Sequence, residues 1–324
     1  MNFPVFDLHC DTALRLLGDD VNQAGSLNAN TGHIDLTRAQ ALPGYCQCFA
    51  CFTTPYMEQK EWYGLSPVVV FEREIATIQR EVDKNKKKIG LVYSADEIRA
   101  NQEKGKMSAL LTIEGPAGFG FDPELLESMF EAGFRISTLG WNERNVLTGS
   151  NQTGEGLTDL GRDYVRRCQE LGIIVDVSHI SDAGFWDIMK VTQGPIIASH
   201  SNSRAVCNHP RNLTDDMFRA IRDTGGVAGI NQFAEFLGEK PTLDTICDHI
   251  FHFLELDPEG THIALGGDLD GCDKLSDGFE GIQSYGALAD RLLERGLGED
   301  MVRNLYWNNA LGVMDAAVPN NKKC

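Results

Sequence analysis

The sequence lacks the features that mark a membrane-spanning or secreted protein. No run reaches the ~18 consecutive apolar residues that a membrane-spanning helix needs. The segment Met1–Pro4 carries no basic residue ahead of its short apolar run, unlike a signal peptide. The nine cysteines are an odd number and lie scattered along the chain, which fits reduced thiols better than a disulfide framework. These absences predict a cytoplasmic protein with no leader to be removed and no membrane partner.

Positive charge is also scarce in this chain. Lysine and arginine number 29 against 47 aspartates and glutamates, which gives a net charge of −18. A surface of that sign repels nucleic acid and anionic lipid, so neither is expected as a partner. We interpret the acidity as an aid to solubility rather than as a device for steering substrate.

One cysteine pair, Cys48 and Cys51, has the spacing of a redox or zinc motif. The pair lies inside the apolar run 45–52, and no second pair follows at zinc-finger spacing. Thiols buried in the core therefore explain this pair better than a metal or redox site.

Short apolar runs alternate with longer amphipathic stretches along the chain. The runs predicted as strands are 5–9, 46–52, 109–113, 135–139, 173–178, 195–199, 226–231 and 263–267. The stretches predicted as helices are 68–87, 124–132, 158–171, 182–192, 214–224, 242–256, 284–296 and 299–314. Ser181 and Thr214 supply capping oxygens where two of these helices begin, and Gly172 and Gly225 end two others.

Five of the predicted strands end at a side chain that could bind a metal or transfer a proton. These side chains are His9 with Asp11, Glu114, His179, His200 and Asp268. Two residues apart, His9 and Asp11 project to the same side of a strand. A buried glutamate such as Glu114 needs a cation nearby. Each residue alone has an ordinary explanation, such as a core histidine or a turn aspartate, but five coincidences in one strand pattern indicate a built site.

The alternation predicts an α/β fold, a (β/α)8 TIM-type barrel. A doubly wound open sheet is the alternative. The barrel is favoured because the carboxyl ends of its strands converge at one mouth, where the candidate ligands would meet. Residues 12–45 and 53–67 do not fit the repeat and are expected as loop insertions over the barrel, so residues 1–324 are interpreted as a single domain.

The candidate residues are the donor set of a hydrolytic site with two metal ions. Two divalent ions about 3.5 Å apart can share a hydroxide and activate it near neutral pH. His9 and Asp11 are predicted to hold one ion, and His179 and His200 the other. Glu114 would bridge them. Imidazole and carboxylate ligands suit zinc best, although manganese or cobalt could substitute.

Asp268 and Arg211 complete the predicted site. Asp268 lies between glycines and could accept the proton of the attacking water and pass it to the leaving group. Arginine is suited to bidentate binding of a carboxylate, so Arg211 is a candidate for holding an anionic substrate. A structural salt bridge from Arg211 to Asp215 or Asp216 is the alternative.

Over almost its whole length the sequence resembles the renal (membrane) dipeptidase family, a branch of the amidohydrolase-like metal-dependent barrels. The motifs that carry the resemblance are Asp7-x-His9-x-Asp11-Thr12, Glu114-Gly115, Asp176-x-Ser178-His179, Ser199-His200-Ser201, Pro210-Arg211-Asn212 and Gly267-Asp268-x-Asp270-Gly271. The resemblance implies a binuclear zinc dipeptidase, often dimeric, which accepts dipeptides and sometimes a D-residue at the C-terminal position. It also implies that Arg211 contacts the substrate carboxylate.

The sequence departs from the family pattern at Trp141. Better-known members of the family carry a histidine there, which polarises the scissile carbonyl. An indole nitrogen can donate a hydrogen bond but cannot carry charge. Losing an oxyanion donor typically costs about 2.7–4 kcal/mol of transition-state stabilisation, which Asn142 or polarisation by the metal could offset. Trp141 and Asn142 are therefore both expected to contact the substrate.

The sequence predicts a zinc-dependent dipeptidase that acts through a metal-bridging hydroxide. Trp141 motivates one alternative, a hydrolase of the same scaffold that acts on N-acyl amino acids or lactams. A metal-containing binding protein without activity is a further alternative, against which the complete ligand set argues.

Overall fold

The computed structural model describes residues 3–17, 25–60 and 63–318 of the chain. Eight parallel strands close into a barrel, because β1 pairs with β4 on one side and with β11 on the other. In barrel order they are β1 (Val5–Cys10), β4 (Tyr45–Phe52), β6 (Met107–Glu114), β7 (Phe134–Thr138), β8 (Ile174–Asp176), β9 (Ile196–Ala198), β10 (Val227–Ile230) and β11 (Ile263–Leu265). The predicted (β/α)8 barrel is confirmed, and the open-sheet alternative is wrong.

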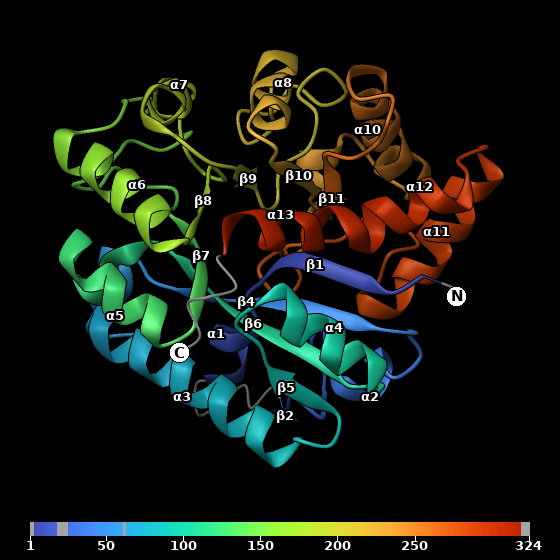
Figure 1. Cartoon of the computed structure of the whole chain (residues 1–324), viewed down its shortest axis with the longest axis horizontal. Helices are drawn as coiled ribbons and strands as arrows, with labels where there is room; N and C mark the ends of the chain where they lie inside the picture. The colour runs from blue at the N-terminus through green and yellow to red at the C-terminus, as the bar shows by residue number, and fades with distance from the viewer. Residues whose placement is uncertain (1–2, 18–24, 61–62, 319–324) are drawn as a thin grey trace.

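Helices surround the strands as an outer ring (Figure 1). They are α3 (Pro67–Lys84), α4 (Ala95–Glu103), α5 (Leu126–Glu131), α6 (Asp159–Leu171), α7 (Asp182–Val191), α8 (Asp215–Asp223), α10 (Leu243–Leu256) and α11 (Tyr285–Glu294). The predicted caps are present: the Ser181 side chain accepts from the Gly184 amide, and the Thr214 side chain accepts from the Met217 amide. Gly172 ends α6 at a φ of +89°, a left-handed conformation that favours glycine.

Outside the predicted loop insertions, strand β5, helix α4 and the last predicted helix differ from the prediction. Strand β5 (Ile89–Leu91), which pairs with the beginning of β6, and helix α4 were not predicted. A three-residue strand that contains a glycine is too short to show a periodic signal. The predicted helix 299–314 consists of α12 (Glu299–Arg303), a π-helical turn (Asn304–Asn308) and α13 (Asn309–Ala317), because hydrophobic spacing does not reveal a change of helix type.

The segments predicted as loop insertions contain short regular elements. Residues 12–45 include α1 (Thr12–Leu17), the hairpin of β2 (Gly25–Ser26) with β3 (Ala29–Asn30), and α2 (Leu36–Ala39). Residues 53–67 include a 3-10 turn at Pro55–Glu58. Residues 18–24 and 61–62 of these segments lie outside the described residues. Helices of four to six residues were missed because they are too short to show a clear amphipathic pattern.

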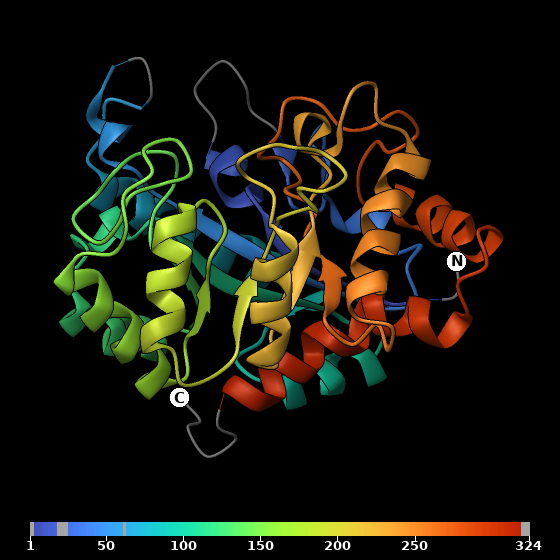
Figure 2. The same ribbon diagram turned by 90° about the horizontal axis from the view of Figure 1, so that it is seen from above.

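An apolar cluster fills the barrel interior near the amino ends of the strands. Every barrel strand contributes to it, through Phe6, Leu8, Cys46, Cys48, Leu110, Ile136, Ile174, Ile197, Val227 and Ala264. Trp307, Leu311 and Met314, from the π-helical turn and α13, pack against the cluster. Figure 2 shows α13 crossing one end of the molecule, with most of the long loops gathered at the other. The loops at that other end surround the carboxyl ends of the strands, where a barrel carries its functional site.

The described cysteines are free thiols, and Cys48 and Cys51 are both buried, in agreement with the interpretation as core residues. A search of the described helices found none that is long and apolar enough to cross a membrane.

Candidate metal centre

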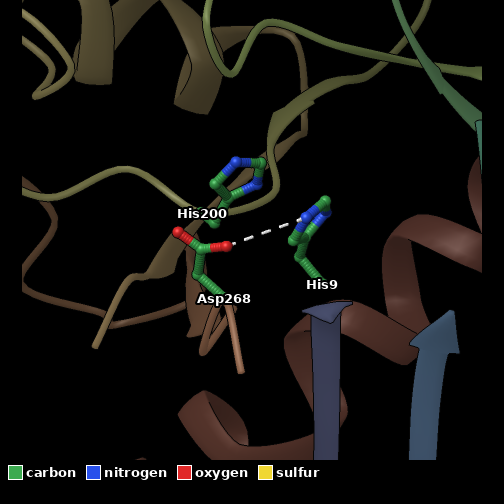
Figure 3. A group of neighbouring side chains, drawn as sticks. All are labelled: His9, His200 and Asp268. Carbon is green, nitrogen blue, oxygen red and sulfur yellow. Dashed lines mark ion pairs between the residues drawn. The ribbon is translucent and has the colours of Figure 1, made fainter. Parts of the chain in front are cut away.

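The residues predicted as metal ligands meet at the carboxyl ends of the strands. Their donor atoms form three groups, each within 4.8 Å: His9 with Asp11 and Glu114, Glu114 with His179 and His200, and His9 with His200 and Asp268. Figure 3 shows the third group, in which the carboxylate of Asp268 points toward the ring of His9. Glu114 belongs to two of the groups, as a bridging carboxylate must.

A β-bulge in β1 brings His9 into this cluster. Asp7 and Cys10 are paired with Gln47 and Phe49, so three residue steps on β1 oppose two on β4. Leu8 therefore faces the barrel interior while Cys10 belongs to the outer core, and His9 and Asp11 both approach Glu114.

Asp7 fixes the tip of the bulged strand from outside the barrel. Its carboxylate Oδ1 accepts from the backbone amides of His9 and of Gly267, each at 3.0 Å. Tyr285 donates to its other oxygen, so Asp7 ties β1 to α11 and to the segment that follows β11. Sequence reasoning gave Asp7 no role beyond its place in the motif, because the partners lie some 260 and 278 residues away.

His179 and His200 present two lone pairs to each other. Ser199 uses its single hydroxyl proton to donate to Asp176, so it accepts from Nδ1–H of His200 at 2.6 Å. Nδ1–H of His179 donates to Oδ1 of Asn142 at 3.1 Å. With both Nδ1 atoms protonated, the Nε2 atoms face each other at 3.0 Å without a proton between them. Burial lowers the pKa of both rings well below 6.5, which keeps them neutral. Nε2 of His179 also lies 3.0 Å from Oε1 of Glu114, so two imidazole lone pairs and a carboxyl oxygen converge at a point where a cation could be held.

On its side of the cluster, His9 lies beside the carboxyl groups of Glu114 and Asp11. Nε2 of His9 lies 3.3 Å from Glu114 and 3.4 Å from Asp11 but makes no aligned hydrogen bond with any described residue. Burial raises the pKa of Glu114 to about 8. Burial alone would lower the pKa of His9, yet the carboxylates of Glu114 and Asp11 outweigh it and raise that pKa well above 6.5. A divalent cation would satisfy this buried set of charges and lone pairs.

Asp268 is aimed into the site by a strained backbone. Its φ is +55°, and that of Asp270 is +68°, a left-handed region that is uncommon for non-glycine residues and that aspartate enters more readily than most. Asn231 donates to Oδ2 of Asp268 at 3.0 Å, while Oδ1 lies 4.0 Å from Nε2 of His9. Burial raises the pKa of Asp268 to about 6. A Cβ on Gly271 would lie 2.0 Å from Oδ2 of Asp11, so a side chain at this position would displace the Asp11 carboxylate.

Arg211 is buried without a carboxylate partner among the described residues. It donates at 3.4 Å to the Ser201 hydroxyl and at 3.5 Å to the His200 carbonyl, and its Nε has no described partner. The predicted alternative, a salt bridge to Asp215 or Asp216, is wrong. Asp215 pairs with His252 and Asp216 with Arg219. A buried guanidinium that lacks a counter-ion is costly, which points to an anionic ligand.

Trp141 and Asn142 both line the cavity over the cluster, and their contact with the substrate stays a prediction. The Trp141 ring centroid lies 5.2 Å from that of Phe52 and 6.3 Å from that of His179. Asn142 has a second task that the sequence did not reveal, because its amide oxygen fixes the tautomer of His179.

The cavity measures about 260 Å³, close to the lower end of the roughly 300–1,000 Å³ of small-molecule sites, so it suits a small substrate. Apolar residues that sequence reasoning missed also line it, namely Leu14, Phe52, Phe233 and Phe236. Their hydrophobic character gave no signal, because it is equally typical of core packing.

Imidazole and carboxylate donors at the mouth of a TIM-type barrel, beside an arginine that no described carboxylate pairs with, define a metal-dependent hydrolase site. The model of the membrane dipeptidase family, peptidase family M19, matches residues 1–323. The chain belongs to this family, and it is therefore a metal-dependent dipeptidase.

Two relatives illustrate the similarity of sequence. An uncharacterised dipeptidase of Schizosaccharomyces pombe is 31% identical over 329 aligned positions, which cover 96% of this chain and 80% of that protein. The dipeptidase VerJ of Clonostachys rogersoniana is 28% identical, with 97% and 84% covered.

A solved structure illustrates the similarity of fold. A metallopeptidase of Rhodobacter sphaeroides, liganded with a phosphinate mimic of the dipeptide L-Ala-D-Ala, is 25% identical with a TM-score of 0.87. The comparison covers 98% of this chain and all of that one. A dipeptidase of family M19 gives the same TM-score at 27% identity, with 98% and 99% covered.

Proposed function

We propose that the protein is a zinc dipeptidase with two ions per chain. The observation that carries this proposal is the facing pair of Nε2 lone pairs on His179 and His200. Glu114 connects that pair to His9 and Asp11. These five side chains supply neutral imidazoles and carboxylates, the donors that zinc prefers. When bound, such ions polarise a carbonyl and make water nucleophilic near neutral pH.

Arg211 binds the C-terminal carboxylate of the dipeptide in this proposal. The guanidinium is buried, has no described counter-ion and lines the same cavity as the candidate ligands. A carboxylate would accept two parallel hydrogen bonds from it. Because Arg211 contacts the His200 carbonyl, a substrate held there places its peptide bond beside the candidate ligands.

Asp268 moves the proton. It accepts a proton from the attacking water and returns it to the leaving amine nitrogen, so its carboxyl group ends in the state in which it began. Asn231 fixes one oxygen of Asp268 and leaves the other directed at the cluster. Asn142 presents its amide oxygen to His179, so its NH2 group remains to donate to the substrate carbonyl where the family pattern has a histidine.

Two features of the substrate belong to the same proposal. The Rhodobacter sphaeroides metallopeptidase was solved with a mimic of a peptide that has a D-residue at its C-terminus, which supports testing D-residues here. N-acyl amino acids remain the alternative substrates, since they share the carboxylate and the scissile amide.

We also propose a homodimer, which light scattering after size-exclusion chromatography would measure.

Amine release from a panel of L-L and L-D dipeptides by zinc-loaded protein tests the proposal. Glu114→Ala is expected to lose both bound metal and turnover, because the bridging carboxylate is gone. Glu131→Ala, an exposed position on α5, is the matched control and should retain both. Elemental analysis gives the metal content. Full activity in Glu114→Ala would contradict the proposal, and hydrolysis confined to N-acyl amino acids would favour the alternative.

A further inference from the structure

The cavity over the candidate metal centre has an apolar wall. It consists of Leu14 from α1, Phe52 at the end of β4 and Trp141 after β7. The rings of Phe52 and Trp141 meet edge to face. The residues in the same apolar cluster behind the wall are Leu17, Met57, Leu65 and Val70. Leu14 and Trp141 are only partly buried, so each presents apolar surface to the cavity.

This wall lies across the mouth from Arg211. In the barrel order, β4 stands four positions from β9 in either direction, so Phe52 and the loop after β9 face each other. The candidate histidine ligands lie between them. Arg211 contacts the carbonyl of His200, His200 faces His179, and the ring of His179 lies 6.3 Å from that of Trp141.

The aromatic residues near Arg211 have a different surrounding. The guanidinium carbon of Arg211 lies 5.3 Å from the Phe236 ring centroid, and Phe233 stacks edge to face on Phe236 at 4.8 Å. Phe236 packs on the guanidinium and Phe233 packs on Phe236, whereas Leu14 and Trp141 belong with Phe52 to a separate apolar cluster that borders the cavity. The cavity therefore has apolar side chains at both ends, and the guanidinium lies at one end only.

We propose that Leu14, Phe52 and Trp141 bind a bulky apolar group on the acyl side of the scissile amide. This inference rests on the proposed function, because it takes Arg211 as the carboxylate site. In a dipeptide the scissile nitrogen belongs to the residue that bears the carboxylate, so everything beyond the carbonyl extends away from Arg211. Transfer of an apolar group from water to this wall is favourable.

Two kinds of substrate carry such a group. One is a dipeptide with a large apolar N-terminal residue, and the other is an amino acid with an aliphatic N-acyl chain. The test compares kcat/KM for Leu-Ala, Gly-Ala and N-hexanoyl-alanine on the zinc-loaded protein. Leu-Ala is expected to exceed Gly-Ala by at least about tenfold, the discrimination that an apolar pocket gives for a few carbons.

Trp141→Ala is expected to bring Leu-Ala and Gly-Ala to within about threefold of each other, because the wall loses its largest surface. Trp186→Ala is the matched control: this tryptophan is 41% exposed on α7, and its removal should leave the selectivity unchanged. Leu14→Ala is a second, smaller truncation of the wall, to be measured if Trp141→Ala does not fold. It should reduce the preference in the same direction.

The outcomes separate this inference from the proposed function. Equal rates for Leu-Ala and Gly-Ala in the unaltered protein, or a preference that survives both wall variants, would overturn the apolar wall and leave the dipeptidase intact. If no dipeptide is cleaved, the dipeptidase proposal fails. In that case, calorimetry measures the affinity of the protein for the same three compounds. Tighter binding of Leu-Ala than of Gly-Ala, lost in Trp141→Ala, would support the apolar wall, and equal binding would overturn it. Faster cleavage of N-hexanoyl-alanine would support the wall and identify the acyl chain as the group it binds.

Discussion

The two ends of the barrel interior differ, although the same strands build both. Near the amino ends, apolar side chains from every barrel strand pack on one another and on α13. At the carboxyl ends, imidazoles, carboxylates and a guanidinium face one another with lone pairs and charges unbalanced. The apolar cluster near the amino ends, here called the floor, needs no further partner. The polar cluster at the carboxyl ends, the mouth, has its charges and lone pairs satisfied only when a metal and a substrate are bound. The comparison shows how one barrel separates stability from chemistry along its axis.

Asp268→Asn should have the largest effect, because it removes proton transfer from the mouth. We expect kcat to fall by roughly 10²- to 10⁴-fold. The other two donor groups do not include Asp268, so the bound metal content should stay that of the unaltered protein. Steady-state kinetics together with elemental analysis checks this. Loss of metal in the variant would show instead that Asp268 acts as a ligand, and the division of roles in the mouth would have to be redrawn.

Leu110→Ala should lower the folding stability that the floor provides and leave the activity of the mouth unchanged. Leu110 is fully buried in the inner apolar cluster, and a Leu→Ala change at such a site costs about 2–5 kcal/mol of folding stability. The urea midpoint should fall while kcat per folded molecule stays within about twofold of the unaltered protein. Leu125→Ala, 41% exposed before α5, is the control and should shift the midpoint little. A large loss of kcat in Leu110→Ala would mean that the two ends are coupled.

Arg211→Met should raise KM and leave stability unharmed. A hydrogen bond to a charged group contributes about 1.5–3 kcal/mol, so kcat/KM for a dipeptide should fall by roughly 10- to 100-fold. The variant should also lose the preference for a dipeptide over its C-terminal amide, which measures the carboxylate contact directly. Arg219→Met, on the exposed face of α8, is the control. An unchanged acid-over-amide preference in Arg211→Met would place the substrate carboxylate elsewhere.

Glu74→Gln should have the smallest effect, a change in how the folding stability depends on pH. Glu74 lies behind the mouth, beside the end of β4. Glu74 is a fully buried residue of α3 that accepts from the Phe52 amide at 3.2 Å, and its other oxygen has no partner among the described residues. Burial raises its pKa well above 4.5. The folded protein therefore keeps this proton longer than the unfolded chain. The stability that this group contributes is fully present below about pH 4.5 and is lost as the pH rises through the folded-state pKa.

A glutamine at position 74 keeps the hydrogen bond and removes that pH dependence. The melting temperature of Glu74→Gln relative to the unaltered protein should therefore be higher at pH 8 than at pH 5, by the equivalent of about 1 kcal/mol. Glu72→Gln, exposed on the same helix, should show no such difference. Equal differences at both pH values would mean that Glu74 is already satisfied in the folded protein.

The candidate ligands could be predicted because they follow apolar strands. The residues that orient those ligands could not be predicted in this way. His179 and His200 each follow an apolar strand, a pattern visible in the sequence. Their orientation depends on Asn142 and on Ser199 with Asp176, whose polar side chains are ordinary in any loop. Asn231, which donates to Asp268, lies at the end of β10. Of the last four barrel strands, β10 is the one whose end carries no ionisable candidate, and an asparagine there suggests only a turn.

The sequence by itself determined the alternation of elements, the barrel and the inventory of donors, because hydrophobic periodicity and residue chemistry are local properties. Only the tertiary structure decided that Arg211 has no carboxylate partner among the described residues, that a bulge turns His9 into the cluster, and that Phe52 and the loop of Arg211 lie on opposite sides of the mouth. Those facts depend on distances between residues far apart in the chain. Such distances are fixed by strand register and barrel closure, which no local pattern specifies.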